Sequence, residues 1–123
     1  EFSEDCNSLT LHKTNSTVIK NSVEFTGKCT SKNTKNTIIL EKNYTKGLLT
    51  GYYKVFFENG KVKESIQYVN NIKQGKYLLY SEDGKLIIEG SYKNNLKNSY
   101  WKTYGKSATV KKYDLGTEKK VEN

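Results

Sequence analysis

The sequence predicts an all-β protein, an antiparallel β-meander of tandem β-hairpin repeats that forms a single layer and begins with an N-terminal capping segment. The strongest observation is that glycine, tyrosine and turn positions recur at a spacing of 24 residues. A fixed spacing of this kind is typical of repeat proteins, in which each unit buries its apolar face against its neighbours. The positions that carry the repeat are Gly27, Gly51 and Gly75, then Tyr44, Tyr68 and Tyr92, then Asn36, Gly60 and Gly84.

Two further observations identify each repeat as a pair of strands. Asn59-Gly60 and Asp83-Gly84 are strong hairpin signals, because both central residues of a type I′ turn need a positive φ. Aromatic residues, which favour strands, make up 12% of the chain. We therefore expect an array of about four hairpin units over residues 27–116.

The two ends of the chain depart from the repeat. Residues 1–26 contain short alternating stretches, and we predict that they form a capping segment, because the first unit of a stacked array exposes a strand edge. Residues 117–123 are predicted to be a charged tail. The full length of 123 residues is compatible with one domain.

A two-residue loop at Asn59-Gly60 would also fix the register of the strands, and directly opposed residues share one face of a sheet. The expected pairs are Phe57 with Val62, Val55 with Glu64, Tyr53 with Ile66, Leu79 with Ile88, and Tyr77 with Gly90. The first face, which is the predicted core, then collects Tyr53, Val55, Phe57, Val62, Ile66, Tyr77, Leu79, Leu86, Ile88 and Trp101.

The opposite face, called the second face below, is mostly polar but carries an aromatic residue in every unit. Rings interleaved with lysines could present both apolar surface and positive charge to a partner. Alternatively, the rings form the other half of the core and are covered by residues 1–26. The candidate binding residues are Tyr52, Lys54, Phe56, Lys63, Lys76, Tyr80, Tyr100, Lys102 and Tyr104.

Residues 51–61 and 75–85 share a pattern in which a glycine opens the unit, aromatics follow two and five residues on, and an Asn/Asp-Gly-Lys turn precedes a second strand. This pattern resembles the MORN-repeat variant found in tandem in bacterial proteins. The resemblance implies the hairpin fold. For function it implies several possibilities, because similar repeats occur in antitoxin-like proteins, in surface or secreted proteins and in membrane-associated scaffolds.

The formal net charge is +8, and all 21 basic residues are lysines. Lysine offers a hydrated point charge, whereas bidentate binding of phosphate or guanine depends on arginine. A nucleic-acid partner is therefore disfavoured, while an anionic membrane surface stays open as an alternative. No apolar run reaches the roughly 18 residues that a membrane span needs.

Cys6 and Cys29 are the only cysteines, and an even number in a small chain predicts a disulfide and an extracytoplasmic location. The alternative is two unrelated thiols in a reducing compartment. A zinc site built from Cys and His needs more ligands than two cysteines and one histidine provide. The sequence also contains no cofactor-binding motif.

The sequence does not support a catalytic function. His12 is the only histidine and is expected to be a solvated surface residue, so that no catalytic triad can be assembled. Glu64 is unusual, because the predicted register places it on the apolar face, and we expect it to lie at a rim or to pair with a lysine.

The sequence therefore favours a non-catalytic interaction module, exported from the cell, that binds a protein partner. The alternatives are an antitoxin-like or immunity-like protein that neutralises a cognate toxin, which the resemblance alone implies, and a binder of anionic lipid surfaces.

Overall fold

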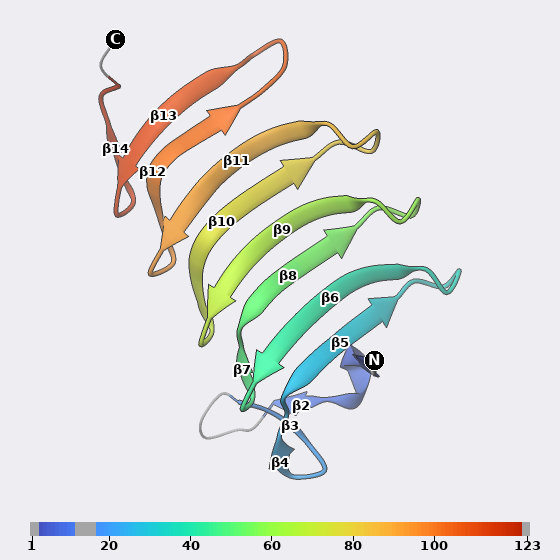
Figure 1. Ribbon diagram of the computed structural model, residues 1–123. Helices are drawn as coiled ribbons and strands as arrows, with labels where there is room; N and C mark the ends of the chain where they lie inside the picture. Colours follow the sequence, from blue (N-terminus) through green and yellow to red (C-terminus); the bar gives the residue numbers. More distant parts are fainter. Residues whose placement is uncertain (1–2, 12–16, 122–123) are drawn as a thin grey trace.

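The computed structural model describes residues 3–11 and 17–121, and these form one long open sheet with a small second sheet at its N-terminal end (Figure 1). The prediction of an all-β meander of hairpins is confirmed. The candidate surface residue His12 lies outside the described residues. In order across the large sheet, the strands are β1 (Ser3–Asp5), β5 (Gly27–Lys32), β6 (Ile38–Thr45), β8 (Gly51–Phe56), β9 (Val62–Val69), β10 (Ile72–Tyr80), β11 (Leu86–Lys93), β12 (Leu96–Thr103), β13 (Thr109–Asp114) and β14 (Thr117–Lys119), with β7 (Leu48–Leu49) paired to β6.

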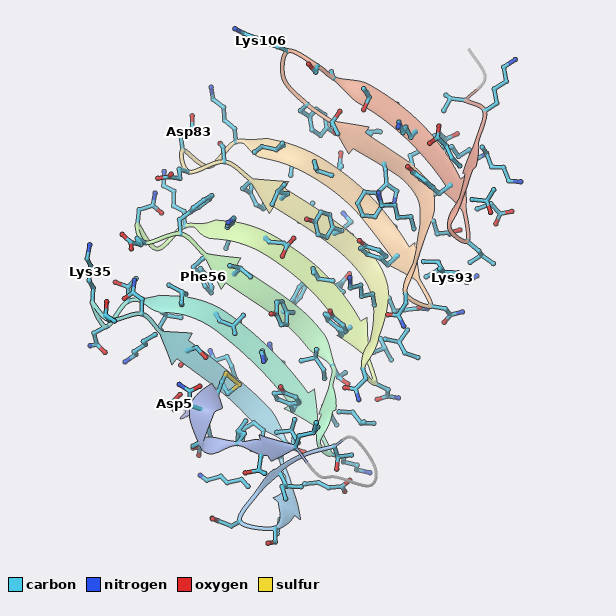
Figure 2. All side chains as sticks on the ribbon, turned by 180° about the vertical axis from the view of Figure 1, so that it is seen from behind. Asp5, Lys35, Phe56, Asp83, Lys93 and Lys106 are labelled. Carbon is cyan, nitrogen blue, oxygen red and sulfur yellow. A yellow bond between two sulfur atoms is a disulfide. The ribbon has the colours of Figure 1, made fainter. Side chains whose placement is uncertain are left out.

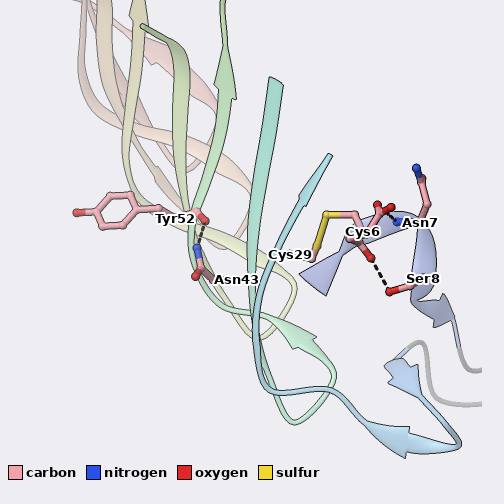
Figure 3. Close-up of a disulfide and its surroundings, with 7 residues drawn as sticks. Cys6, Asn7, Ser8, Cys29, Asn43 and Tyr52 are labelled. Carbon is pink, nitrogen blue, oxygen red and sulfur yellow. Dashed lines mark hydrogen bonds between the residues drawn. A yellow bond between two sulfur atoms is a disulfide. The ribbon is translucent and has the colours of Figure 1, made fainter. Parts of the chain in front are cut away.

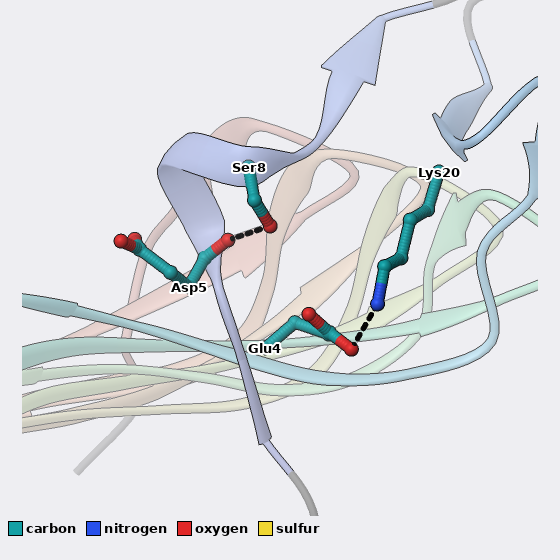
Figure 4. A network of polar contacts seen from close by, with 4 residues as sticks. All are labelled: Glu4, Asp5, Ser8 and Lys20. Atoms are coloured by element: carbon teal, nitrogen blue, oxygen red, sulfur yellow. Dashed lines mark hydrogen bonds and ion pairs between the residues drawn. The ribbon is translucent and has the colours of Figure 1, made fainter.

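The N-terminal segment closes the first edge of this sheet. β1 runs parallel to β5, and the short 3-10 helix η1 (Cys6–Ser8) that follows is joined to β5 by the Cys6–Cys29 disulfide (Figure 3). The predicted disulfide is thus confirmed, and Cys29 is fully buried. Glu4 of β1 also makes an ion pair with Lys20 of the small sheet (Figure 4).

The small sheet consists of β2 (Thr10–Leu11), β3 (Val18–Lys20) and β4 (Val23–Glu24). It is attached to the turn that follows β6, because the Val18 N–H donates to the Gly47 carbonyl at 2.7 Å and the Gly47 N–H donates to the Phe25 carbonyl at 2.8 Å. The described part of the N-terminal segment therefore lies at one edge and one end of the large sheet.

The turns at Asn59-Gly60 and Asp83-Gly84 differ from the predicted type I′ turns. Only the glycine of each pair has a positive φ, at 87° for Gly60 and 89° for Gly84. The Gly60 N–H donates to the Phe57 carbonyl, and the Phe57 N–H donates to the carbonyl of Lys61. This is the pattern of a three-residue loop, in which a type I turn ends in a glycine bulge.

The extra loop residue changes the register next to the turn. Val55 opposite Glu64 and Tyr53 opposite Ile66 are confirmed, but Phe56 and not Phe57 is paired with Val62. A shift of one residue sends a side chain to the other face of a sheet. Val62, predicted for the core face, consequently lies among second-face residues.

The two-residue type I′ pattern occurs instead at the opposite end of the hairpins, within the short polar connections between them. Asn70 and Asn71 have φ values of 48° and 70°, and Val69 is paired with Ile72 directly across them. Asparagine tolerates the left-handed region better than most residues, because its short side chain can hydrogen bond locally. The same two-residue turn, with a positive φ at both positions, is formed by Asn21-Ser22, Lys46-Gly47, Asn94-Asn95 and Leu115-Gly116.

These turns also join one hairpin to the next. The Asn71 N–H donates to the Leu49 carbonyl at 2.8 Å, and the Leu49 N–H donates back to Asn71 Oδ1 at 2.8 Å. Asn95 makes the same two bonds with Lys73, at 3.0 and 2.8 Å. A pair of reciprocal hydrogen bonds therefore repeats from unit to unit along this end of the sheet.

Gly75, which opens one of the repeats, lies at a strand bulge. Between the pairs Lys73–Tyr68 and Tyr77–Ile66, β10 holds two more residues than β9, and Gly75 within this bulge has a φ of 113°. A Cβ atom at Gly75 would lie 2.5 Å from the side-chain oxygen of Gln67. The backbone conformation therefore requires a glycine here, and a side chain would also displace the amide of Gln67.

The first face is built around aromatic rings. Trp101 is 8% exposed and stacks on Tyr77 with ring centroids 5.2 Å apart, while Tyr92 meets it edge-on at 5.0 Å. Tyr77 lies opposite Gly90, as predicted, but the ring that covers this glycine belongs to Trp101, which a Cβ atom there would approach to 2.2 Å. The Trp101 indole N–H donates to the Ser91 carbonyl at 2.9 Å.

We predict that Asn71→Gly destabilises the protein more than Asn70→Gly, by about 1 kcal/mol. Both substitutions keep the freedom to adopt a positive φ, but only the first removes the acceptor of the Leu49 N–H. Urea unfolding monitored by tryptophan fluorescence measures the difference. Equal unfolding midpoints for the two variants would show that the side-chain bond to Leu49 does not contribute to stability.

Candidate functional site

Three of the predicted binding residues meet in one hollow of the second face. Tyr52 and Lys54 come from β8 and Tyr80 comes from β10, and the strand β9 between them contributes Val62 and Ser65. The hollow has a volume of about 680 Å³. We call it the β8–β10 hollow, and its lining residues are Tyr52, Lys54, Gly60, Lys61, Val62, Ser65, Leu78, Tyr80 and Gly84.

A second group of predicted residues surrounds Glu89 on β11. Lys76, Tyr100 and Lys102 line a smaller hollow with this carboxylate. The Tyr104 hydroxyl donates a hydrogen bond to Glu89, and this bond is the main cause of a raised pKa for the Tyr104 hydroxyl. The second group is therefore a mixed-charge cluster.

The remaining two predicted residues, Phe56 and Lys63, line neither of these hollows. Phe56 lies at the register shift beside the turn and is half-buried. The Lys63 ammonium lies 5.8 Å from the centre of the Phe57 ring, a residue of the predicted first face. Phe56, which is paired with Val62, stays on the second face, whereas Lys63 departs from the prediction because the extra loop residue changes the alternation of side chains near the turn.

The second face is open to solvent in the part of the chain that the structure describes. Tyr52 and Tyr100 are each 47% exposed, and Tyr104 is 43% exposed. Figure 3 shows the Tyr52 ring projecting from the side of the sheet opposite the Cys6–Cys29 disulfide, while the Tyr52 carbonyl accepts a 2.7 Å hydrogen bond from Asn43. The described residues of the N-terminal segment therefore leave this ring uncovered.

Lysines lie over aromatic rings on both faces. On the second face, the Lys54 ammonium is 5.3 Å from the Tyr52 ring centre. On the first face, the Lys97 ammonium lies 4.7 Å from the Trp101 ring and 5.2 Å from the Tyr113 ring. The sequence analysis missed this first-face cluster, although one signal for it was present, because Lys73 and Lys97 follow the same 24-residue spacing as the tyrosines.

Glu64 forms a hydrogen bond with a tyrosine, whereas the sequence predicts a position at a rim or a pairing with a lysine. Its carboxylate accepts a hydrogen bond from the Tyr77 hydroxyl of the adjacent strand. Burial, followed by this bond, raises the pKa of the Tyr77 hydroxyl far above its ordinary value of 10.0. The two residues form a structural hydrogen bond in the aromatic face, and burial also raises the pKa values of Tyr44, Tyr68 and Tyr92.

The structure offers no metal centre among its described residues, because no three His, Cys, Asp or Glu side chains there lie close enough to share an ion. Within the same residues, no helix is long and apolar enough to cross a membrane.

We predict that Tyr77→Phe makes the stability of the protein less sensitive to alkaline pH. The folded protein binds the Tyr77 proton more tightly than the unfolded chain, so this contribution to stability is complete below pH 10.0 and is lost progressively as the pH rises above it. The free energy of unfolding, measured by urea titration at several pH values, should fall less steeply in the variant. Identical slopes above that pH in variant and wild type would contradict the prediction.

The comparisons with known proteins agree with the repeat structure. The family model described as the MORN repeat variant matches residues 49–70 and 73–94, two consecutive units that contain β8 to β11. The searches of curated proteins and of solved structures find no match. MORN repeats generally serve as interaction modules. The chain therefore contains two consecutive units of the MORN repeat variant, at residues 49–70 and 73–94.

Proposed function

We propose that this protein is an exported, non-catalytic interaction module that binds a protein partner through its second face. The observation that carries the proposal is the exposure of Tyr52, Tyr100 and Tyr104 on a face that the described N-terminal residues leave open. Exposed aromatic side chains grouped on one surface are characteristic of interaction sites.

The β8–β10 hollow gives this face the chemistry of a protein interface. Tyr52 and Tyr80 provide rigid rings, and Leu78 adds an apolar wall between charged residues. Tyrosine is enriched at protein interfaces because it combines a large contact area with a polar hydroxyl. Because the chain contains no arginine, this surface cannot form the bidentate contacts typical of nucleic-acid recognition.

The Cys6–Cys29 disulfide supports export. It joins η1 to a fully buried cysteine of β5, so that it is part of the folded structure. Such bonds form and persist in oxidising compartments and are rare in the reducing cytosol.

The binding site can be tested by comparing two pairs of substitutions. We expect Tyr52→Ala with Tyr80→Ala to weaken binding at least about tenfold, because aromatic residues dominate interface energies. The control pair, Leu11→Ala with Val23→Ala, removes exposed apolar side chains from the small N-terminal sheet. A partner captured with the wild-type protein is purified, and its affinity for each variant is measured by calorimetry.

If the Tyr52/Tyr80 variant binds as tightly as the wild type, the second face is not the binding site. Circular dichroism and thermal unfolding of both variants establish that a loss of binding does not come from a loss of fold. The control pair should bind normally, since its residues lie outside the second face.

Export can be tested through the cysteines. We expect neither Cys6 nor Cys29 to react with a thiol reagent in native protein isolated from its own cells without reductant, because both sulfurs are bonded. After reduction and unfolding, both cysteines should become labelled. Labelling of both in the unreduced protein would indicate a reducing compartment and would contradict export.

A further inference from the structure

The β8–β10 hollow is positively charged and lacks an internal counter-charge. Lys54 and Lys61 are its charged lining residues, and it is lined by no carboxylate. Among the described residues, five ion pairs are formed, and neither of these lysines takes part in them. Neither ammonium group is therefore held in an ion pair there; Lys54 lies over the Tyr52 ring and opposite Glu41, which is paired with Lys28.

A comparison with the neighbouring units explains why this hollow has no carboxylate. Ser65 lies directly opposite Lys54 in the sheet. The equivalent residues one unit before and one unit after it are Glu41 and Glu89. Glu41 makes an ion pair with Lys28 at 3.8 Å, and Glu89 accepts the Tyr104 hydrogen bond. The serine therefore leaves one hollow of the array without the acid that its neighbours carry.

The rest of the hollow is shaped for an apolar side chain. Val62 and Leu78 form its aliphatic lining, and the rings of Tyr52 and Tyr80 come from the two outer strands. Gly60 leaves the rim of the hollow open, because a Cβ atom added there would meet no atom within 4 Å. The hollow thus offers an apolar lining with Lys54 and Lys61 at its sides. A ligand complementary to it has an apolar side chain with acidic residues on either side.

We infer that the β8–β10 hollow binds an acidic peptide segment of the protein partner, with one aromatic or aliphatic side chain of that segment inside the hollow. Carboxylates beside this side chain meet Lys54 and Lys61. The inference rests on the proposed function and specifies the chemistry of its partner. The net charge of +8 further favours an acidic partner by long-range attraction.

The probe for this inference is a library of short random peptides displayed on phage and selected on the immobilised protein. We expect the selected peptides to combine Asp or Glu with a central aromatic or aliphatic residue. Their affinities are then measured for the wild type and for two double variants of equal charge. Lys54→Glu with Lys61→Glu alters the hollow, whereas Lys93→Glu with Lys106→Glu alters two exposed residues at opposite ends of the hairpins, the last residue of β11 and a residue of the turn after β12 (Figure 2).

Both double variants lower the formal charge from +8 by the same amount. We expect the Lys54/Lys61 variant to bind the peptides at least about tenfold more weakly and the Lys93/Lys106 variant to bind nearly normally, because only close charge pairs act strongly at physiological salt. A further variant, Ser65→Glu, introduces the residue that both neighbouring units already hold. It should also weaken binding.

Two results would overturn the inference. In the first, the selected peptides lack acidic residues, or they bind the Lys54/Lys61 variant as tightly as the wild type. The hollow then does not bind an acidic segment, but the proposal that another region of this protein binds a protein partner is unaffected. If no peptide is selected and the protein instead sediments with phosphatidylserine vesicles, equally weakened in both double variants, then the inference and the proposed function both fail. A lipid surface would contact any protruding lysine and so would not distinguish the two pairs.

Discussion

Asn71 and Asn95 each form two hydrogen bonds to the hairpin before them, and these bonds connect the units of an array that forms a single layer in the part of the chain that the structure describes. A single sheet cannot bury side chains between two packed layers, so each unit depends on its neighbours. The aromatic contacts on the first face also connect neighbouring units. Tyr77 stacks on Trp101 across three neighbouring strands, and the glycine at position 90 leaves room for the indole against the backbone.

The contacts that stabilise the array and the surface proposed to bind a partner lie on different parts of the sheet. The turns at one end and the rings of the first face hold the array together, and Trp101 and Ile66 are buried there. The second face contributes less burial, and Tyr52 and Tyr100 stay half exposed. A surface that the fold does not need to cover is free to vary in charge and shape, and we place the proposed binding function there for this reason.

The sequence was sufficient for the repeat length, the hairpin architecture and most of the strand register. The turn type predicted for Asn59-Gly60 and Asp83-Gly84 was wrong, because Asn-Gly and Asp-Gly are equally compatible with a type I′ turn and with a type I turn that ends in a glycine bulge. The choice between them decides whether Val62 joins the core or the β8–β10 hollow, so a local ambiguity of one residue changed the candidate site. The positive φ values of Asn70 and Asn71 become evident only when the strands on either side are paired, because asparagine is common throughout the chain and does not single out these two positions.

An array of similar units would by default present similar hollows, and small differences between units decide which hollow can bind a given partner. The β8–β10 hollow spans the junction between the two segments that match the family model, with Tyr52 from one and Tyr80 from the other. At the next junction the position of Tyr80 is taken by Tyr104, whose hydroxyl is already bonded to Glu89. Because the serine at position 65 has no such carboxylate, Lys54 and Lys61 line this hollow without an acidic lining residue. One substitution within a repeated framework is therefore enough to make one site on the second face different from its neighbours.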